Sequence, residues 1–292
     1  MLEKIMKLSV IIPCFNAANT IAVQLEALAH QHWCEPWEVI VSDNGSTDET
    51  LAIVEQYQEK LPNLRIVNSS DRRGAAHARN VGASVAASDT LAFCDADDEV
   101  APGWVAAMGE ALSKYDFVAG KREYNKLNEP WILKYRTLTQ LNGLQDYSYP
   151  PYLAHAASCN LGVRRLIHEA IGGFDETMLR LQDTDYCWRI QLAGTKLHFV
   201  PEPVVHYRFR DTIGGLFQQG RLWGEYNVLL YKKYRPLGMP KLSFYESVRS
   251  WVRLLKLFPQ CFSEEDRAKL VTVSARRIGR LQGCIKYRVL AL

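Results

Sequence analysis

Residues 8–14 read LSVIIPC, an apolar run rich in β-branched side chains that stops at Pro13. This composition predicts a buried strand, because β-branched side chains pack well on a pleated sheet and proline cannot donate to the next ladder bond. Behind it, Ile21, Leu25 and Leu28 recur at helical spacing after the polar pair Asn19-Thr20, which predicts a capped helix. A buried strand followed by an amphipathic helix is the repeating unit of an α/β sheet.

The same alternation continues through the first hundred residues. Further strands and helices are expected at residues 38–42, 46–61, 64–67, 75–87 and 91–94. The capping box Ser46-Thr47-Asp48-Glu49 is expected to open the first of these helices. Continuous apolar strands between helices imply a mostly parallel, Rossmann-like sheet with helices on both faces. Such sheets bind ligands beyond the carboxyl ends of their strands.

Weaker signals follow beyond residue 120. A helix is expected over 182–193, two short strands over 197–200 and 204–207, and a helix over 216–234. Helical segments with basic flanks are expected around residues 251–256 and 275–278. The predicted organisation is therefore one α/β domain over 1–231, with a donor-nucleotide half at 1–120 and an acceptor half at 121–231. A basic helical extension occupies 232–292.

Polar residues follow each of the four early strands. They are Cys14-Phe15-Asn16, Asp43-Asn44-Gly45, Asp71-Arg72-Arg73-Gly74 and Asp95-Ala96-Asp97-Asp98. If the strand continued into the last stretch, Asp95 and Asp97 would point to the same side and could hold one cation together. The alternative is a solvated helix-capping turn, in which Asp98 could cap a helix that starts near Pro102.

Several classes of protein are excluded by the sequence. The first strand precedes PCFNAANT, which contains neither a dinucleotide fingerprint nor a phosphate-binding loop. An EF-hand counted from Asp95 would have Val100 and Ala106 where it needs Gly and Glu. The seven cysteines form no CxxC pair, so neither a disulfide framework nor a zinc site is expected. With no apolar run near about 20 residues and no signal-peptide pattern, we expect a cytoplasmic protein.

The ordered set of motifs resembles the family 2 glycosyltransferases of the GT-A fold, over roughly residues 7–210. The matching stretches are Ser9-Val10-Ile11-Ile12-Pro13 with Asn16, Val41-Ser42-Asp43-Asn44-Gly45-Ser46, Ala78-Arg79-Asn80-Val81-Gly82, Phe93-Cys94-Asp95-Ala96-Asp97-Asp98, Gly172-Gly173-Phe174-Asp175-Glu176 and Gln182-Asp183-Thr184-Asp185. The resemblance implies an inverting, metal-dependent transfer of a sugar from a nucleotide-sugar donor, most often UDP-linked, to an acceptor hydroxyl. The acceptor would be a saccharide or a lipid-linked sugar in the synthesis of a cell-surface polysaccharide or glycolipid.

The resemblance also implies roles for particular residues. Mn²⁺ or Mg²⁺ would be held by Asp97, with Asp95 helping through the metal or the ribose. His206 could be a third ligand or, equally, a structural histidine at a strand end. Donor-nucleotide contacts fall to Pro13, Phe15, Asn16, Asp43 and Arg79. Asp43 would accept a hydrogen bond from the base, although a turn-forming aspartate is the alternative.

The second acidic motif is expected to supply the general base. In the resembling family a Glu-Asp pair opens a helix after the GGFD turn, whereas this chain has Gln182-Asp183. One acid within hydrogen-bond reach of the hydroxyl suffices for general-base catalysis, so we expect Asp183 to act and Asp185 to be the substitute.

The net charge of +3 hides an asymmetry, since residues 232–292 hold 14 Lys/Arg against 4 Asp/Glu. This tail either contacts an anionic membrane or forms a solvated helical hairpin. The near match of Gln218-Gln219-Gly220-Arg221-Leu222-Trp223 to a processive-synthase motif has one extra residue, which favours single transfers. A sugar-nucleotide nucleotidyltransferase and a non-catalytic sugar-binding protein of this fold remain the alternatives. No nucleic-acid partner is expected.

Overall fold

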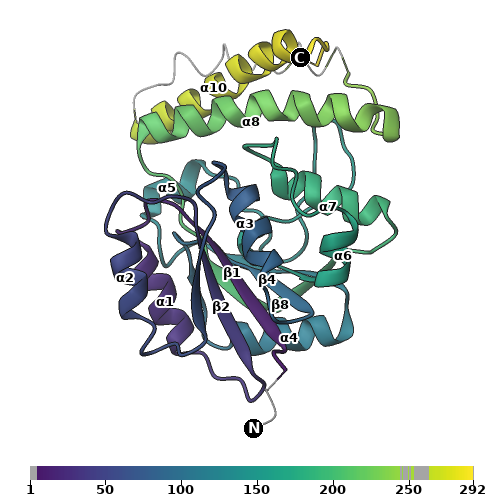
Figure 1. Cartoon of the computed structure of the whole chain (residues 1–292). Coiled ribbons are helices and arrows are strands. Elements are labelled where there is room, and N and C mark those ends of the chain that lie inside the picture. Colours follow the sequence, from purple (N-terminus) through teal and green to yellow (C-terminus); the bar gives the residue numbers. More distant parts are fainter. Residues whose placement is uncertain (1–4, 244, 246–248, 250, 253–262, 292) are drawn as a thin grey trace. The chain divides into compact units, whose positions relative to one another are not determined.

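The computed structural model describes residues 5–243, 245, 249, 251–252 and 263–291. An eight-stranded sheet has the order β3-β2-β1-β4-β7-β6-β8-β5 (Figure 1). Its strands are β1 (Leu8–Cys14), β2 (Trp37–Asp43), β3 (Leu64–Asn68), β4 (Thr90–Phe93), β5 (Glu99–Val100), β6 (Phe117–Glu123), β7 (Leu161–Arg164) and β8 (His198–His206). The first four strands pair in parallel, and β7 runs antiparallel to both of its neighbours. The predicted mostly parallel α/β sheet is confirmed.

Helices cover both faces of this sheet, as the alternation of β1 side chains requires. On one face, Val10 and Ile12 pack into a core with residues of α1 (Ile21–Ala29) and α4 (Trp104–Lys114). On the other face, Ile11 packs with residues of α3 (Ala75–Ser84) and α7 (Gln182–Leu192). The remaining helices are α2 (Thr50–Gln56), α5 (Pro130–Tyr135), α6 (Arg165–Ala170), α8 (Ile213–Tyr234) and α10 (Glu264–Tyr287), with 3₁₀ turns at Ser158–Asn160 and Arg235–Leu237.

Two local expectations differ from the structure. The Ser46–Glu49 box does not open a helix, since α2 begins at Thr50. Instead, Ser46 Oγ accepts a hydrogen bond from Asn16 N at 2.9 Å, and Asp48 Oδ2 accepts one from Ala18 N at 3.1 Å. The two short strands expected at 197–207 form one strand, β8, which accommodates an irregularity through a register shift against β6.

The acidic stretch after β4 is a turn rather than an extended strand. β4 ends at Phe93, so strand alternation does not govern the aspartates that follow. The expectation that alternation brings Asp95 and Asp97 together was therefore wrong. Asp98 does not cap the next helix either, because α4 begins at Trp104 after Gly103 in the left-handed region.

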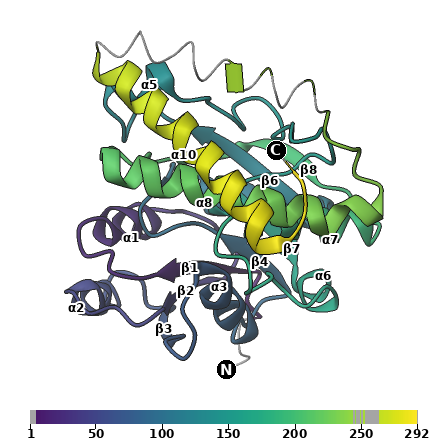
Figure 2. The same ribbon diagram turned by 90° about the horizontal axis from the view of Figure 1, so that it is seen from above.

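The chain forms two compact units. The first comprises residues 1–127, 139–145 and 155–208 and contains the whole sheet; the second comprises 128–138, 146–154 and 209–292. The boundary expected at residue 231 lies inside α8, which packs against α10 in the second unit; Figure 2 shows the two helices crossing obliquely. Gly224 permits this packing, because a Cβ there would lie 2.0 Å from the Arg276 carbonyl oxygen. Segment 251–256 lies partly outside the described residues.

Among the described residues, no helix combines the length and apolarity that a membrane span requires.

Candidate active site

The loops after β1 and β2 hold each other at the carboxyl edge of the parallel strands. Asn44 N donates to the Cys14 carbonyl at 2.7 Å. The buried Asp43 carboxylate accepts from Gly45 N at 3.1 Å and from Ser46 N at 3.2 Å. The Asp43 carboxylate thus stabilises the turn, which is the alternative role that the sequence offered for it.

Asn16 and Phe15 lie at the same edge of the sheet, but Asn16 binds the neighbouring loop whereas Phe15 exposes its ring. Asn16 lies in the left-handed region with φ of 48°, and its Oδ1 accepts from Thr47 N at 2.8 Å. Phe15 is half exposed, and the Arg73 guanidinium lies 4.3 Å from its ring centre. Pro13 pairs in register with Ser42 of β2. Of the three nucleotide-binding residues expected from the first loop, Phe15 presents an exposed ring, while Pro13 pairs with β2 and Asn16 binds the loop after β2.

Arg79 connects helix α3 to the acidic turn. Its Nη2 donates to Asp95 Oδ1 at 2.5 Å, and its guanidinium lies 5.6 Å from the Phe174 ring centre. The Arg79 side chain is almost completely buried, and its Nε and Nη1 have no hydrogen-bond partner among the described residues. A buried guanidinium with free donors is suited to a further anionic ligand.

Asp98 is buried in the acidic turn and does not cap a helix. It is 1% exposed, its Oδ1 accepts from Arg208 N at 2.8 Å, and its Oδ2 has no partner in the described part of the chain. Ligand atoms of Asp95, Asp98 and Cys159 all lie within 4.8 Å of one another. Burial, followed by the charges of Asp97 and Asp95, raises the pKa of Asp98 well above its usual range.

Asp97 stands at the surface of the same turn. Its side chain is exposed, while its backbone oxygen accepts from Arg208 Nε at 2.9 Å. Arg208 thus joins Asp97 and Asp98 to the end of β8, which also pairs with β5 through His206 and Glu99. The acidic turn is fixed by long-range contacts that no local sequence pattern indicates.

His206 contacts a residue that the sequence did not indicate. Its Nδ1 lies 2.7 Å from Glu123 Oε2, and the two residues are paired in register on β8 and β6. A carboxylate on one ring nitrogen is the usual support for a histidine that ligates a metal through the other nitrogen. His206 is not part of the Asp95, Asp98 and Cys159 group, so its role as a ligand stays a prediction.

Asp183 lies in the first turn of α7, and its Oδ1 accepts from Thr184 N at 2.8 Å. Burial raises its pKa, which the Thr184 hydrogen bond and Arg79 partly oppose. Asp95 raises it further, so Asp183 lies within electrostatic range of the acidic turn. Asp185, the residue expected to substitute as the general base, is fully buried and forms an ion pair with Arg189 Nε at 2.7 Å.

Arg122 is a second buried cation that sequence analysis missed. It is 7% exposed, and its charge lowers the pKa values of Asp98 and Asp183 as one of several smaller effects. Its guanidinium lies 4.5 Å from the Tyr207 ring centre. The sequence Lys121-Arg122-Glu123 at the end of β6 did not indicate a buried arginine, because a run of charged residues in a strand is usually exposed to solvent.

The residues at the acidic turn fit a divalent cation. Four carboxylates, those of Asp95, Asp97, Asp98 and Asp183, outnumber the two buried guanidiniums of Arg79 and Arg122. Carboxylate oxygens are the ligands that Mg²⁺ and Mn²⁺ prefer, and the unpartnered Asp98 Oδ2 is one such oxygen. The Cys159 thiol suits these ions poorly, because it is soft and burial raises its pKa well above the usual range.

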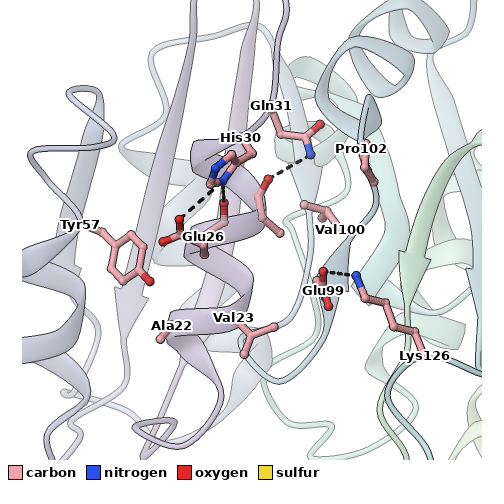
Figure 3. A pocket seen from close by; sticks show the side chains of 11 residues that line it. Ala22, Val23, Glu26, His30, Gln31, Tyr57, Glu99, Val100, Pro102 and Lys126 are labelled. Carbon is pink, nitrogen blue, oxygen red and sulfur yellow. Dashed lines mark hydrogen bonds and ion pairs between the residues drawn. The ribbon is translucent and has the colours of Figure 1, made fainter.

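A separate hollow of about 600 Å³ lies beside α1. Figure 3 shows Glu26 and His30 on one side and the Glu99–Lys126 ion pair, 2.5 Å long, on the other. None of the site residues expected from the sequence lines this hollow. It therefore adds nothing to the arrangement at the acidic turn.

The sheet, its helical layers and the carboxyl-edge site define a glycosyltransferase-type α/β protein of the GT-A fold. The family model "Glycosyl transferase family 2" matches residues 9–172, more than half of the chain. The chain therefore belongs to glycosyl transferase family 2.

The chain is similar to two proteins named as glycosyltransferases, over part of the length of each. Glycosyltransferase AglE of Haloferax volcanii is 30% identical over 200 residues, which cover 67% of this chain and 65% of AglE. The uncharacterized glycosyltransferase YibD of Escherichia coli is 41% identical over 102 residues, which cover 35% of this chain and 29% of YibD. The chain thus spans less than two thirds of either relative.

Solved structures of low sequence identity share the fold. The mannosyltransferase PcManGT from Pyrobaculum calidifontis, in complex with GDP-Man and Mn²⁺, superposes with a TM-score of 0.66 at 17% identity; the match covers 94% of this chain and 87% of PcManGT. TarS 1–349 of S. aureus, in complex with UDP-GlcNAc, gives 0.56 at 20% identity, covering 97% of this chain and 92% of that chain. These likenesses confirm the predicted GT-A fold.

Proposed function

We propose that this chain is an inverting glycosyltransferase that moves a sugar from a nucleotide-sugar donor, UDP-linked in the first instance, to an acceptor hydroxyl in single transfers. The acceptor would be a saccharide or a lipid-linked sugar in polysaccharide or glycolipid synthesis. The observation that carries the proposal is the gathering of Asp95, Asp98, Asp183 and Arg79 at the carboxyl edge of the sheet.

The donor would occupy the loops after β1 and β2. Phe15 offers an exposed ring for a base, and Asp43 offers a carboxylate oxygen for a base N–H. Arg79 has free N–H groups beside Asp95, where a ribose or a phosphate oxygen would be received. The bound nucleotides of TarS and PcManGT support a nucleotide-sugar donor for this fold.

Asp97 and Asp95, together with the unpartnered oxygen of Asp98, would hold a divalent cation, and His206 is the candidate for a further ligand. When bound, such a cation stabilises negative charge on a departing diphosphate. The cation would also stabilise the ionised carboxylates of Asp95 and Asp98, because it offsets the repulsion between them. The Mn²⁺ in PcManGT supports this proposal, since that protein has the same fold.

Asp183 would accept the proton of the acceptor hydroxyl. Its raised pKa makes it a stronger base than an exposed aspartate, and a positioned base contributes about 10²–10⁴-fold to a rate. The Thr184 backbone N–H occupies only Oδ1, so Oδ2 can face a hydroxyl. Attack from the side opposite the leaving group then gives inversion.

The experiment measures release of nucleoside diphosphate by the purified chain from a panel of nucleotide sugars, with Mn²⁺, Mg²⁺ or a chelator. A thermal-shift screen with Mn²⁺ would choose the donor, since a ligand that binds the native state raises Tm. We expect Asp183→Asn to lose turnover but keep nucleotide binding, and Glu110→Gln, at an exposed position of α4, to behave as wild type. Turnover that survives chelation would refute the metal dependence, and near-normal turnover by Asp183→Asn would refute the base.

A further inference from the structure

The second unit contains two largely buried arginines that have no acidic partner among the residues that the structure describes. Arg276 and Arg280 lie one turn apart on α10. Arg280 is 9% exposed, Arg276 is partly exposed, and each has a buried Nε without a hydrogen-bond partner among the described residues. A buried charge without a partner is costly, so its presence needs a reason.

Each of these guanidiniums makes a cation–π contact with an aromatic ring. Arg280 lies 3.5 Å from the ring centre of Tyr149, and Arg276 lies 5.3 Å from that of Trp223 on α8. A ring that occupies the face of a guanidinium leaves the in-plane N–H edge for a ligand. The Tyr149 ring is itself fixed, because its hydroxyl donates to the Ala291 carbonyl.

The nearby acid is already used by other cations. Glu225 on α8 is buried, and its Oε1 lies 2.7 Å from Lys286 Nζ and 3.2 Å from the Tyr287 hydroxyl. Its Oε2 lies 3.8 Å from Arg221 Nη1. Among the described residues, no carboxylate is one of the main influences on the pKa of Arg276 or Arg280. Burial lowers both pKa values, and the neighbouring arginines Arg277 and Arg136 lower that of Arg276 further.

We propose that Arg276 and Arg280 form a binding site for a phosphate group, carried either by a soluble phosphorylated molecule or by a lipid headgroup. Two guanidinium edges one helical turn apart match the several oxygens of a phosphate, which arginine binds with paired hydrogen bonds. Arg136, whose guanidinium lies 4.8 Å from the Phe209 ring centre, adds positive charge to the site. All of the residues of this site belong to the second unit, whereas the residues proposed for the donor site belong to the first.

The first test titrates inorganic phosphate into the metal-free protein at constant ionic strength and follows Tm. Wild type is compared with the double variant Arg276→Gln/Arg280→Gln and with Arg267→Gln, which removes an exposed charge from the same helix. We expect a saturable rise of Tm in wild type and in Arg267→Gln, and binding weaker by at least about tenfold in the double variant. Equal rises in all three proteins, or no saturable rise and no arginine-dependent vesicle binding, would overturn the proposal.

The second test identifies the source of the phosphate by co-sedimentation with vesicles of phosphatidylcholine, with or without phosphatidylglycerol. Sedimentation that needs phosphatidylglycerol and both arginines supports a lipid headgroup, whereas saturation by free phosphate alone supports a soluble ligand.

A stability measurement separates a binding role from a structural one. Without phosphate, Arg280→Met should have a Tm equal to or above that of wild type, because it removes an unpaired buried charge at similar volume. The same variant should lose the phosphate response. If Arg280→Met unfolds or lowers Tm with and without phosphate alike, Arg280 is a packing residue and the proposal fails. Should the double variant not fold, Arg276→Gln alone provides the comparison.

Discussion

Arg79 Nη2 lies 2.5 Å from Asp95 Oδ1, and this ion pair connects helix α3 to the acidic turn after β4. Arg79 is 3% exposed at its side chain and Asp95 is 27% exposed. The pair therefore loses much of its hydration and depends on its own geometry.

Arg79→Met should lower the free energy of unfolding by roughly 2–4 kcal/mol, because Asp95 loses its partner in a partly desolvated site. Adding Mn²⁺ should recover more stability in this variant than in wild type, since the uncompensated negative charge is larger. Denaturant titrations with and without Mn²⁺ measure both effects. The control is Arg72→Met, whose half-exposed pair with Glu176 should contribute at most about 1 kcal/mol. Equal losses in the two variants would contradict a special role for Arg79.

Asp98→Asn should stabilise the metal-free protein at alkaline pH. The pKa of Asp98 is raised in the folded state, so wild type loses stability as pH rises from the unfolded pKa, about 3.9, towards the folded value. Asparagine does not titrate, while its oxygen can still accept from Arg208 N. We expect similar Tm values near about pH 4 and a higher Tm for the variant near about pH 8. A constant difference across this range would argue against the raised pKa.

His77→Gln should cost more stability in mild acid than in alkali. His77 Nε2 lies 2.9 Å from Asp71 Oδ1 and Nδ1 lies 3.0 Å from Glu176 Oε2. Burial opposes the charge of His77, but the two carboxylates outweigh it and raise the pKa. The stabilisation is thus complete below the unfolded pKa, about 6.5, and is lost as pH rises through the folded value.

We expect the loss to be about 1–2 kcal/mol near about pH 6 and smaller near about pH 8.5, as measured by urea denaturation. His32→Gln, at an exposed position, should change stability little at either pH. A pH-independent loss in His77→Gln would show that only packing is affected.

Two glycines of α8 should respond to alanine in opposite directions. A Cβ at Gly224 would meet the Arg276 carbonyl oxygen at 2.0 Å, whereas nothing lies within 4 Å of a Cβ at Gly214. Gly224→Ala should therefore force α8 and α10 apart and cost about 1–3 kcal/mol. Gly214→Ala should add about 0.5–1 kcal/mol through helix propensity. Thermal unfolding of both variants provides the comparison, and a tolerated Gly224→Ala would contradict the close packing.

The activity proposed for this chain should fall in acid with an apparent pKa above the ordinary aspartate value of about 3.9. Burial raises the pKa of Asp183, and a general base must be ionised to accept a proton. The measurement is kcat/KM against pH with a fixed donor and metal. Residual turnover by Asp183→Asn should be about 10²–10⁴-fold lower and should lack this acidic limb. An unchanged limb in the variant would assign it to another group.

Local patterns were sufficient where a residue's environment follows from its neighbours in sequence. The run at residues 8–12 and the helical spacing of Ile21, Leu25 and Leu28 gave β1 and α1 within two residues at each end. Similar patterns predicted α7 and the parallel pairing of the first strands. They failed where a polar side chain is used by a distant segment, as at Ser46–Glu49 and in the turn after β4.

The sequence by itself therefore determined the α/β layering, the family and the placement of acidic residues after the strands, because these depend on short-range periodicity and motif order. Tertiary structure decided which of those acids meet. Asp98 joins Asp95 and Cys159 because Arg208, 110 residues away along the chain, binds it from the end of β8. Likewise, only the packing of α8 on α10 shows that Arg280 of the basic tail is buried and that Arg276 is partly buried. Burial and unpaired charge arise from contacts between distant segments, and no local pattern encodes them.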